Sequence, residues 1–260
     1  MKKNRRFTIM FLCFVLVFIT NFGVHAKEDH KTEKVMDEYY TEIRDPQILL
    51  DKYILLCKEK LSISTDDNRF SVDLDSNDIT VTQLLMKSTS REGDEIRYYS
   101  TSRLLLTDEN NNLLTKEQIM GMATVHSGSS VVYGGHYNVA VMLTAYWQWQ
   151  MVNMVQLVRC TSTTSQIVNN NTGTYRVTEL KNYFYKAADI TEHDDAPDAM
   201  VTFTNPNGYT SYTAVNPNQN FVSMALYFSM YYVGVQITYN TGAVEDISIN
   251  IKQECQYDGE

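Results

Sequence analysis

The sequence predicts a mainly β protein, and three observations support that prediction. From Tyr137 to Trp149 apolar side chains recur at every second position, ending in Trp147 and Trp149, and a period of two is typical of a half-buried strand. The stretch 221–239 is apolar on both parities, which favours a strand inside the fold. Turn-forming clusters rich in Asn, Gly and Pro separate the other short apolar runs. We therefore expect a β-sandwich of immunoglobulin-like character over about residues 136–252, built around the two tryptophans.

Residues 1–26 have the layout of a secretory signal peptide. A basic start, Lys2 to Arg6, precedes an apolar run over 9–19, and Val24-His25-Ala26 offers a cleavage point. The run is shorter than the ~20 residues that a membrane-spanning helix needs, which favours cleavage. The alternative is an uncleaved N-terminal anchor that would hold the protein at a membrane.

The composition suits a globular, acidic protein. Of the 260 residues, 43% are hydrophobic and 12% aromatic, which is enough for a substantial core. The formal net charge is −9, and removal of residues 1–26 would leave 18 basic against 31 acidic residues, or −13. Such a chain is a poor candidate for binding nucleic acid or an anionic membrane. We expect no nucleic-acid partner, and membrane contact only through the signal segment.

Residues 27–65 are expected to form a polar lead-in followed by an amphipathic helix. Asp45 precedes Pro46 as an N-cap, and apolar residues then recur at helical spacing over 46–61. We expect this helix to pack on the β core rather than to bind a partner.

Residues 66–135 predict a β-hairpin region followed by a glycine-containing loop. Alternating runs flank a turn at 91–94, and a shift in apolar parity predicts a bulge near Gln83. Thr115 and Gln118 match a capping box, which predicts a helical turn over 116–120. This region either joins the following sheet or forms a small separate layer.

Within the predicted 136–252 domain, the sequence leaves some junctions open. No Gly or Pro separates the central strand from Val152, so the chain must either bend or turn tightly near Gln150. We predict a strand over 175–185, although helical spacing also fits. The 221–239 stretch is too long for one ordinary strand, so we expect a bend near Ser229 or Gly234. Asn240-Thr241-Gly242 closes a hairpin, and residues 253–260 form a tail.

Three cysteines follow the signal segment, namely Cys57, Cys160 and Cys255. An odd number allows one disulfide and one thiol. We expect a Cys160–Cys255 bond, because both residues lie at ends of predicted strands; closing so long a loop stabilises by about 4–5 kcal/mol in the chain-entropy model. Three free buried thiols are the alternative. The cysteines do not have the spacing of a zinc site.

No catalytic or cofactor motif stands out, and we expect no cofactor. Phosphate-binding glycine loops and the G-x-S-x-G elbow are absent. A nucleophile made from Cys160 with His126 or His136 lacks an activating neighbour. Asp73–Asp78 begins like an EF-hand loop but lacks its glycine and its twelfth ligand. The best candidate for a weak calcium site is an acidic loop that contains Glu192, Asp194, Asp195 and Asp198.

Tyrosine is unusually frequent, at 18 residues. Most of these rings suit packing on strands, but exposed tyrosines also bind sugars or proteins at low entropic cost. Tyr209 and Tyr212, between two Pro-containing turns, are the best exposed pair. We therefore expect an exported, non-enzymatic extracellular or cell-surface protein that binds an unknown protein or glycan or has a structural role. The alternative is a secreted hydrolase of glycans or peptides, whose carboxylates the sequence does not locate.

Overall fold

The structure is a computed structural model that describes part of the unit Lys34–Glu260. The described residues are 34–59, 69–74, 76–90, 93–108, 112–126, 130–133, 138–169, 171, 176–187, 197–223 and 230–251. In these ranges the chain is mainly β, with two antiparallel sheets and a short separate hairpin. The predicted signal segment and the 253–260 tail lie outside the described residues.

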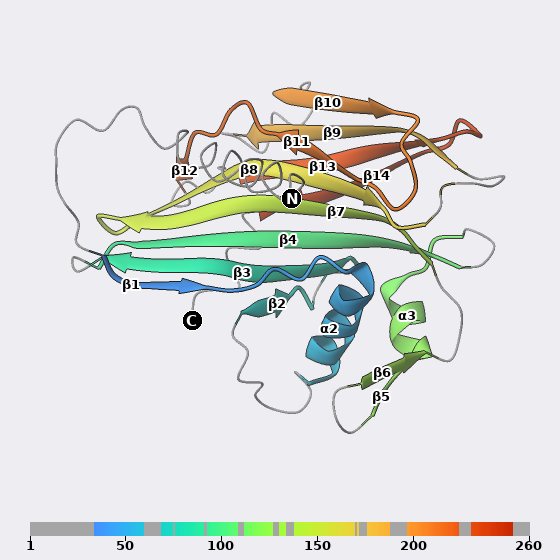
Figure 1. The fold of residues 1–260 in the computed structure, drawn as a ribbon, viewed down its shortest axis with the longest axis horizontal. Helices are drawn as coiled ribbons and strands as arrows, with labels where there is room; N and C mark the ends of the chain where they lie inside the picture. Colours follow the sequence, from blue (N-terminus) through green and yellow to red (C-terminus); the bar gives the residue numbers. More distant parts are fainter. Residues whose placement is uncertain are drawn as a thin grey trace, which may run out of the picture. The chain divides into compact units, whose positions relative to one another are not determined.

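The larger sheet has eight strands and is built around the predicted central strand. Its main path is β1 (Lys34–Tyr39), β3 (Ile79–Ser90), β4 (Glu95–Thr107), β7 (Asn138–Val152), β8 (Val155–Ile167) and β11 (Ser211–Val215). The short strands β2 (Phe70–Val72) and β12 (Val222–Ser223) pair with β3 and β8. Figure 1 shows β3, β4, β7 and β8 side by side. The region of the predicted hairpin therefore joins the central strand, because β4 pairs with β7.

The smaller sheet has four strands, in the order β10 (Ala199–Thr204), β9 (Val177–Ala187), β13 (Met230–Tyr239) and β14 (Val244–Asn250). β9 confirms the predicted strand at this place over the helical alternative. β13 lies between β9 and β14, as its apolar residues on both parities predicted. Its pairing continues through Gly234 without a change of register, and Ser229 lies outside the described residues, so the expected bend stays a prediction.

Two helices occur in the described ranges, and side-chain caps begin both. α2 (Pro46–Glu59) starts after Asp45, whose Oδ1 accepts hydrogen bonds from Gln47 N at 2.8 Å and Ile48 N at 3.1 Å. α3 (Lys116–Met122) has the predicted capping box: Thr115 Oγ1 accepts from Gln118 N, and Gln118 Oε1 accepts from Thr115 N. A hairpin of β5 (Ala123–His126) and β6 (Ser130–Tyr133) follows.

The indole of Trp147 lies in the core that the two sheets share. Trp147 is 1% exposed and stacks on Tyr99 at 4.3 Å between ring centroids, with 17° between the planes. Its Nε1 donates to Thr101 Oγ1 at 2.9 Å, so the buried N–H has a partner. The surrounding apolar cluster takes residues from both sheets, among them Leu143, Trp149, Val158, Phe184, Val235 and Ile249.

Polar contacts also join the two sheets inside this core. Asn182 of β9 is fully buried; its Oδ1 accepts from Ser165 Oγ at 2.8 Å and its Nδ2 donates to Thr163 Oγ1 at 3.0 Å, both on β8. Arg103 of β4 donates to the carbonyl oxygen of Ser248 on β14 at 2.7 Å. Because a buried amide and a half-buried guanidinium group are costly without partners, these bonds favour one alignment of the sheets.

The opposite face of the larger sheet is partly apolar and partly polar. At one end α2 buries Leu49, Leu50, Tyr53 and Ile54 in a second cluster with sheet residues that include Leu104 and Met142. Two residues further along β4 and β7 the same face carries Ser102 and Thr144, which share a 2.9 Å hydrogen bond. The helix therefore covers the apolar end of this face.

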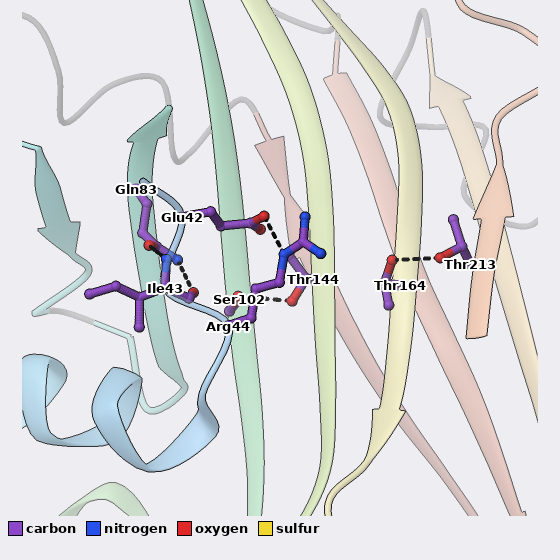
Figure 2. Close-up of polar contacts among 8 residues, drawn as sticks. All are labelled: Glu42, Ile43, Arg44, Gln83, Ser102, Thr144, Thr164 and Thr213. Carbon is purple, nitrogen blue, oxygen red and sulfur yellow. Dashed lines mark hydrogen bonds and ion pairs between the residues drawn. The ribbon is translucent and has the colours of Figure 1, made fainter. Parts of the chain in front are cut away.

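The segment before α2 crosses this polar part of the sheet. Gln83 pairs with the backbone of Ile43 through two 2.9 Å bonds, one from Ile43 N and one to Ile43 O. Figure 2 shows Glu42 and Arg44 above β4 and β7, where they form a 2.5 Å ion pair. It also shows a second hydroxyl pair, Thr164 with Thr213, further along the sheet. Side-chain hydrogen bonds thus replace apolar packing on this part of the sheet.

A two-residue turn joins β7 to β8. Asn153 and Met154 adopt φ values of 50° and 62°, and Val152 pairs with Val155. Left-handed values at both central positions are typical of the tight hairpin turn whose twist matches the flanking strands. Of the two possibilities that the sequence left open near Gln150, the chain therefore turns tightly, directly after the end of β7.

We expect Trp147→Ala to lower the free energy of unfolding by about 3–5 kcal/mol, because it leaves a cavity between the sheets and removes the partner of Tyr99. Urea denaturation of the purified protein measures the loss. Met154→Ala is the control: Met154 is 93% exposed, and its truncation should change stability by no more than ~0.5 kcal/mol. A loss below ~1 kcal/mol in Trp147→Ala would contradict the shared core.

We expect Met154→Gly to raise the free energy of unfolding by roughly 0.5–1 kcal/mol. A left-handed conformation costs an L-residue ~1–2 kcal/mol, and glycine avoids that cost. The greater conformational entropy of glycine in the unfolded chain offsets only part of this stabilisation. Val215→Gly is the matched control, since Val215 is also exposed but lies in strand β11; it should destabilise by about 1 kcal/mol. Equal effects of the two glycines would argue against the turn geometry.

Candidate functional site

The predicted pair occupies two different environments, with Tyr209 just before β11 and Tyr212 within it. Tyr209 is 73% exposed and has a φ of 55°. Tyr212 is half-buried; its ring centroid lies 5.2 Å from that of Phe203, and its Oη accepts a hydrogen bond from Asn207 N. Tyr209 is therefore accessible to a ligand, whereas the ring of Tyr212 also packs within the fold.

The other predicted sites lie partly outside the described residues. Glu192, Asp194 and Asp195 are not described, and Asp198 is exposed just before β10. No group of three or more His, Cys, Asp or Glu side chains that could hold a metal ion occurs within the described ranges. Asp73, from the EF-hand-like run, is buried and accepts a hydrogen bond from Ser76 N.

Cys160 is a buried free thiol, as is Cys57. Its Sγ lies 3.4 Å from the carbonyl oxygen of Tyr146, and burial raises the pKa of the thiol far above its usual value. Cys255 and His136 lie outside the described residues. The structure therefore does not support the predicted Cys160–Cys255 disulfide, and a thiol kept protonated in the core is a poor nucleophile.

The outer face of the smaller sheet carries a hollow of about 320 Å³ lined by tyrosines. We call it the tyrosine pocket; its lining residues are Lys181, Tyr183, Tyr185, Pro197, Met200, Tyr232, Gln236 and Asp246. Alternation along the strands places these residues outward, because Phe184, Val233 and Val235 between them enter the core. The inner face of this sheet thus builds the fold, and its outer face forms the pocket.

Three rings form the aromatic part of the pocket. The centroid of Tyr183 lies 5.5 Å from that of Tyr185 and 6.3 Å from that of Tyr232, and the last two are 6.2 Å apart. Tyr185 and Tyr232 face each other across β9 and β13. At these separations aromatic rings touch one another, so the three side chains make one continuous surface.

Gly234 provides the space for Tyr183. It lies opposite Tyr183 in the β9–β13 pair, and a Cβ atom on it would come within 2.2 Å of Tyr183 Cζ and Oη and 2.8 Å of the Ile247 carbonyl oxygen. Only a residue without a side chain allows the ring to lie flat across β13. Tyr183 is consequently 7% exposed, although it is on the outer face.

Hydrogen bonds hold two of the rings. Tyr183 Oη donates to Asp246 Oδ1 at 2.5 Å, and Tyr232 Oη lies 2.5 Å from Ser248 Oγ, both partners being on β14. Burial, and then the neighbouring carboxylate, raise the pKa of Tyr183 far above its usual range, so the phenol stays a donor. Burial also raises the pKa of Asp246, against the opposing effects of the Tyr183 bond and of Arg103.

A polar row lies beside the rings. Lys181, Gln236 and Asp246 are direct neighbours across β9, β13 and β14. Lys181 Nζ is 2.8 Å from Glu179 Oε1. Rings next to an amide, an ammonium and a carboxylate can bind a small ligand that has both an apolar face and hydrogen-bonding groups.

The sequence contains the pocket tyrosines but does not group them. Tyr183, Tyr185 and Tyr232 lie in runs of aromatic residues that strand packing explains equally well. One available signal was Gly234, an isolated glycine inside an apolar strand, which indicates a close approach. The pairing of β9 with β13, across more than forty residues of chain, is what brings the rings together.

Comparisons with known proteins assign no family to this chain. No family model, no curated protein and no solved structure matches it significantly. Neither helix in the described part of the chain is long and apolar enough to cross a membrane. The geometry of the pocket is therefore the basis for inferring what this protein does.

We expect Gly234→Ala to destabilise the protein by about 1–3 kcal/mol, because the added methyl group must displace the Tyr183 ring or the β14 backbone. Gly121→Ala is the matched control: a Cβ there meets nothing within 4 Å and it lies in α3, so alanine should be neutral or stabilise by up to ~1 kcal/mol.

A double variant separates these two causes of the Gly234→Ala defect. If the ring is the obstacle, Tyr183→Leu combined with Gly234→Ala should lose less stability than the sum of the single losses, as measured by urea unfolding. Additive losses would point to the Ile247 carbonyl instead.

Proposed function

We propose that this protein is an exported, non-enzymatic binding protein that takes its ligand in the tyrosine pocket. The fold that we infer for it is a β-sandwich of immunoglobulin-like character, with the smaller sheet as the ligand-binding layer. The apolar cluster that draws on both sheets and the polar bonds between β8 and β9 support the two-layer arrangement.

The observation that carries the binding role is the continuous surface of Tyr183, Tyr185 and Tyr232. Large apolar rings usually pack in the core, but these three lie on the outer face beside a hollow. Gly234 leaves space for Tyr183, which binds Asp246, and Tyr232 binds Ser248. Rings held rigidly lose little conformational entropy when a ligand binds. This arrangement suits recognition.

The rival function, a secreted hydrolase of glycans or peptides, needs groups that the described pocket wall does not provide together. Hydrolysis of a glycoside by the usual route uses two carboxyl groups that flank the bond. Asp246 is the single carboxyl group among the described lining residues, and its Oδ1 accepts the hydrogen bond from Tyr183. A binding role therefore fits this pocket better than hydrolysis.

Export is supported by the basic and apolar pattern of residues 1–26. We expect N-terminal sequencing of the protein recovered from the culture medium of its host to begin at or near Lys27. Recovery with the membrane fraction and with residues 1–26 intact would favour the anchored alternative instead.

The binding function is tested with panels of immobilised glycans and peptides, probed with the protein from Lys27 onward. We expect the wild type to bind at least one probe, and Tyr185→Ala to weaken that binding about tenfold or more, because it removes part of the ring surface. Tyr209→Ala is the matched control, an exposed tyrosine outside the pocket. Equal loss in both variants, or release of a cleaved product from the bound probe, would count against the proposal.

A further inference from the structure

We propose that the ligand of the tyrosine pocket is a neutral glycan that spans at least two sugar rings, with one ring stacked on Tyr185 and Tyr232 and the hydroxyl groups of the next bonded to the row Lys181, Gln236 and Asp246. This inference depends on the binding function proposed above. It adds the chemical class of the ligand.

The strand register sorts the pocket floor into apolar and polar rows. Tyr185 and Tyr232 form one row, Tyr183 and Gly234 the next, and Lys181, Gln236 and Asp246 the third. Successive rows on one face of a sheet are about 7 Å apart. The polar row is therefore about 14 Å from the row of Tyr185 and Tyr232, with Tyr183 between them. A sugar ring has an apolar C–H face and a rim of hydroxyl groups, so one ring can stack on the tyrosines while a second, linked ring presents its hydroxyl groups to the polar row.

The polar row has the donors and acceptors that hydroxyl groups need. The Gln236 amide offers both, the Asp246 carboxylate has acceptor capacity beyond the bond from Tyr183, and the Lys181 ammonium has N–H groups beyond its contact with Glu179. A hydroxyl group both donates and accepts, so it can pair with each member of this row. Free hydroxyl groups are what neutral glycans provide.

The charge around the pocket favours a neutral ligand over an anionic one. Lys181, Asp246 and Glu179 together carry one net negative charge, and Asp198 also acts electrostatically on Tyr185, so the surroundings of the pocket disfavour an anion. The chain as a whole is acidic, at −9, and repels acidic glycans and other anions.

A small organic cation is the rival ligand, because the ring faces can also contact a cation, and tetramethylammonium is therefore included in the test below. The geometry disfavours long peptides. The volume of about 320 Å³ is at the small end of ligand pockets. It suits a unit of two sugar rings rather than an extended peptide.

The experiment titrates the protein with soluble ligands by calorimetry: a neutral oligosaccharide chosen from the glycan panel, an acidic oligosaccharide, tetramethylammonium and the best peptide. We expect the neutral oligosaccharide to bind most tightly, with a Kd that changes less than about twofold between low and high salt, since no charge is neutralised. Tyr185→Ala should weaken binding about tenfold and Gln236→Ala roughly fivefold. Tyr209→Ala should leave it unchanged.

The outcomes separate the two proposals. Peptide, acidic glycan or tetramethylammonium as the tightest ligand, weakened by Tyr185→Ala, would overturn the neutral-glycan inference and leave the binding function standing. Neutral glycan binding that Tyr185→Ala and Gln236→Ala leave intact, or no binding of any probe, would overturn both. Far-ultraviolet circular dichroism and the urea midpoint establish that each variant is folded, and Tyr185→Leu replaces Tyr185→Ala if the latter is not.

Discussion

Burial of the Trp147 indole is the constraint on which the rest of the fold depends. The ring is 1% exposed, stacks on Tyr99 and gives its N–H to Thr101. A large ring can be buried in the middle of a sheet only if a second layer covers that face, and strands β9, β13 and β14 contribute residues to the same cluster. The apolar residues on one face of β7 therefore need the smaller sheet as their cover.

The opposite face of the larger sheet is covered differently, by a helix at one end and by side-chain hydrogen bonds along the rest. Leu104 and Met142 need an apolar cover, and α2 supplies it with Leu49, Leu50 and Ile54. Ser102 and Thr144 satisfy each other by a hydrogen bond, and Gln83 binds the backbone that leads into the helix. Hydroxyl and amide groups on a half-covered face lose little when they exchange water for such partners.

The smaller sheet uses the same alternation for two purposes. Phe184, Val233 and Val235 face the core, so Tyr183, Tyr185 and Tyr232 must face outward. What distinguishes this outer face is Gly234, which lets Tyr183 lie across the neighbouring strand and reach Asp246. The pocket is thus a consequence of sheet packing plus one missing side chain.

Local patterns in the sequence were enough to predict the β class, the central strand with its two tryptophans, the caps of both helices and the hairpin at 240–242, because a period of two and a capping box involve neighbouring residues. A tight turn after the central strand was one of two alternatives that the sequence left open, since neither Asn153 nor Met154 is a glycine that signals a left-handed conformation. The tyrosine pocket could not be found, because Tyr185 and Tyr232 meet only through the register of distant strands. Which strands pair is decided by burial of the whole apolar surface, and that is a property of the tertiary structure.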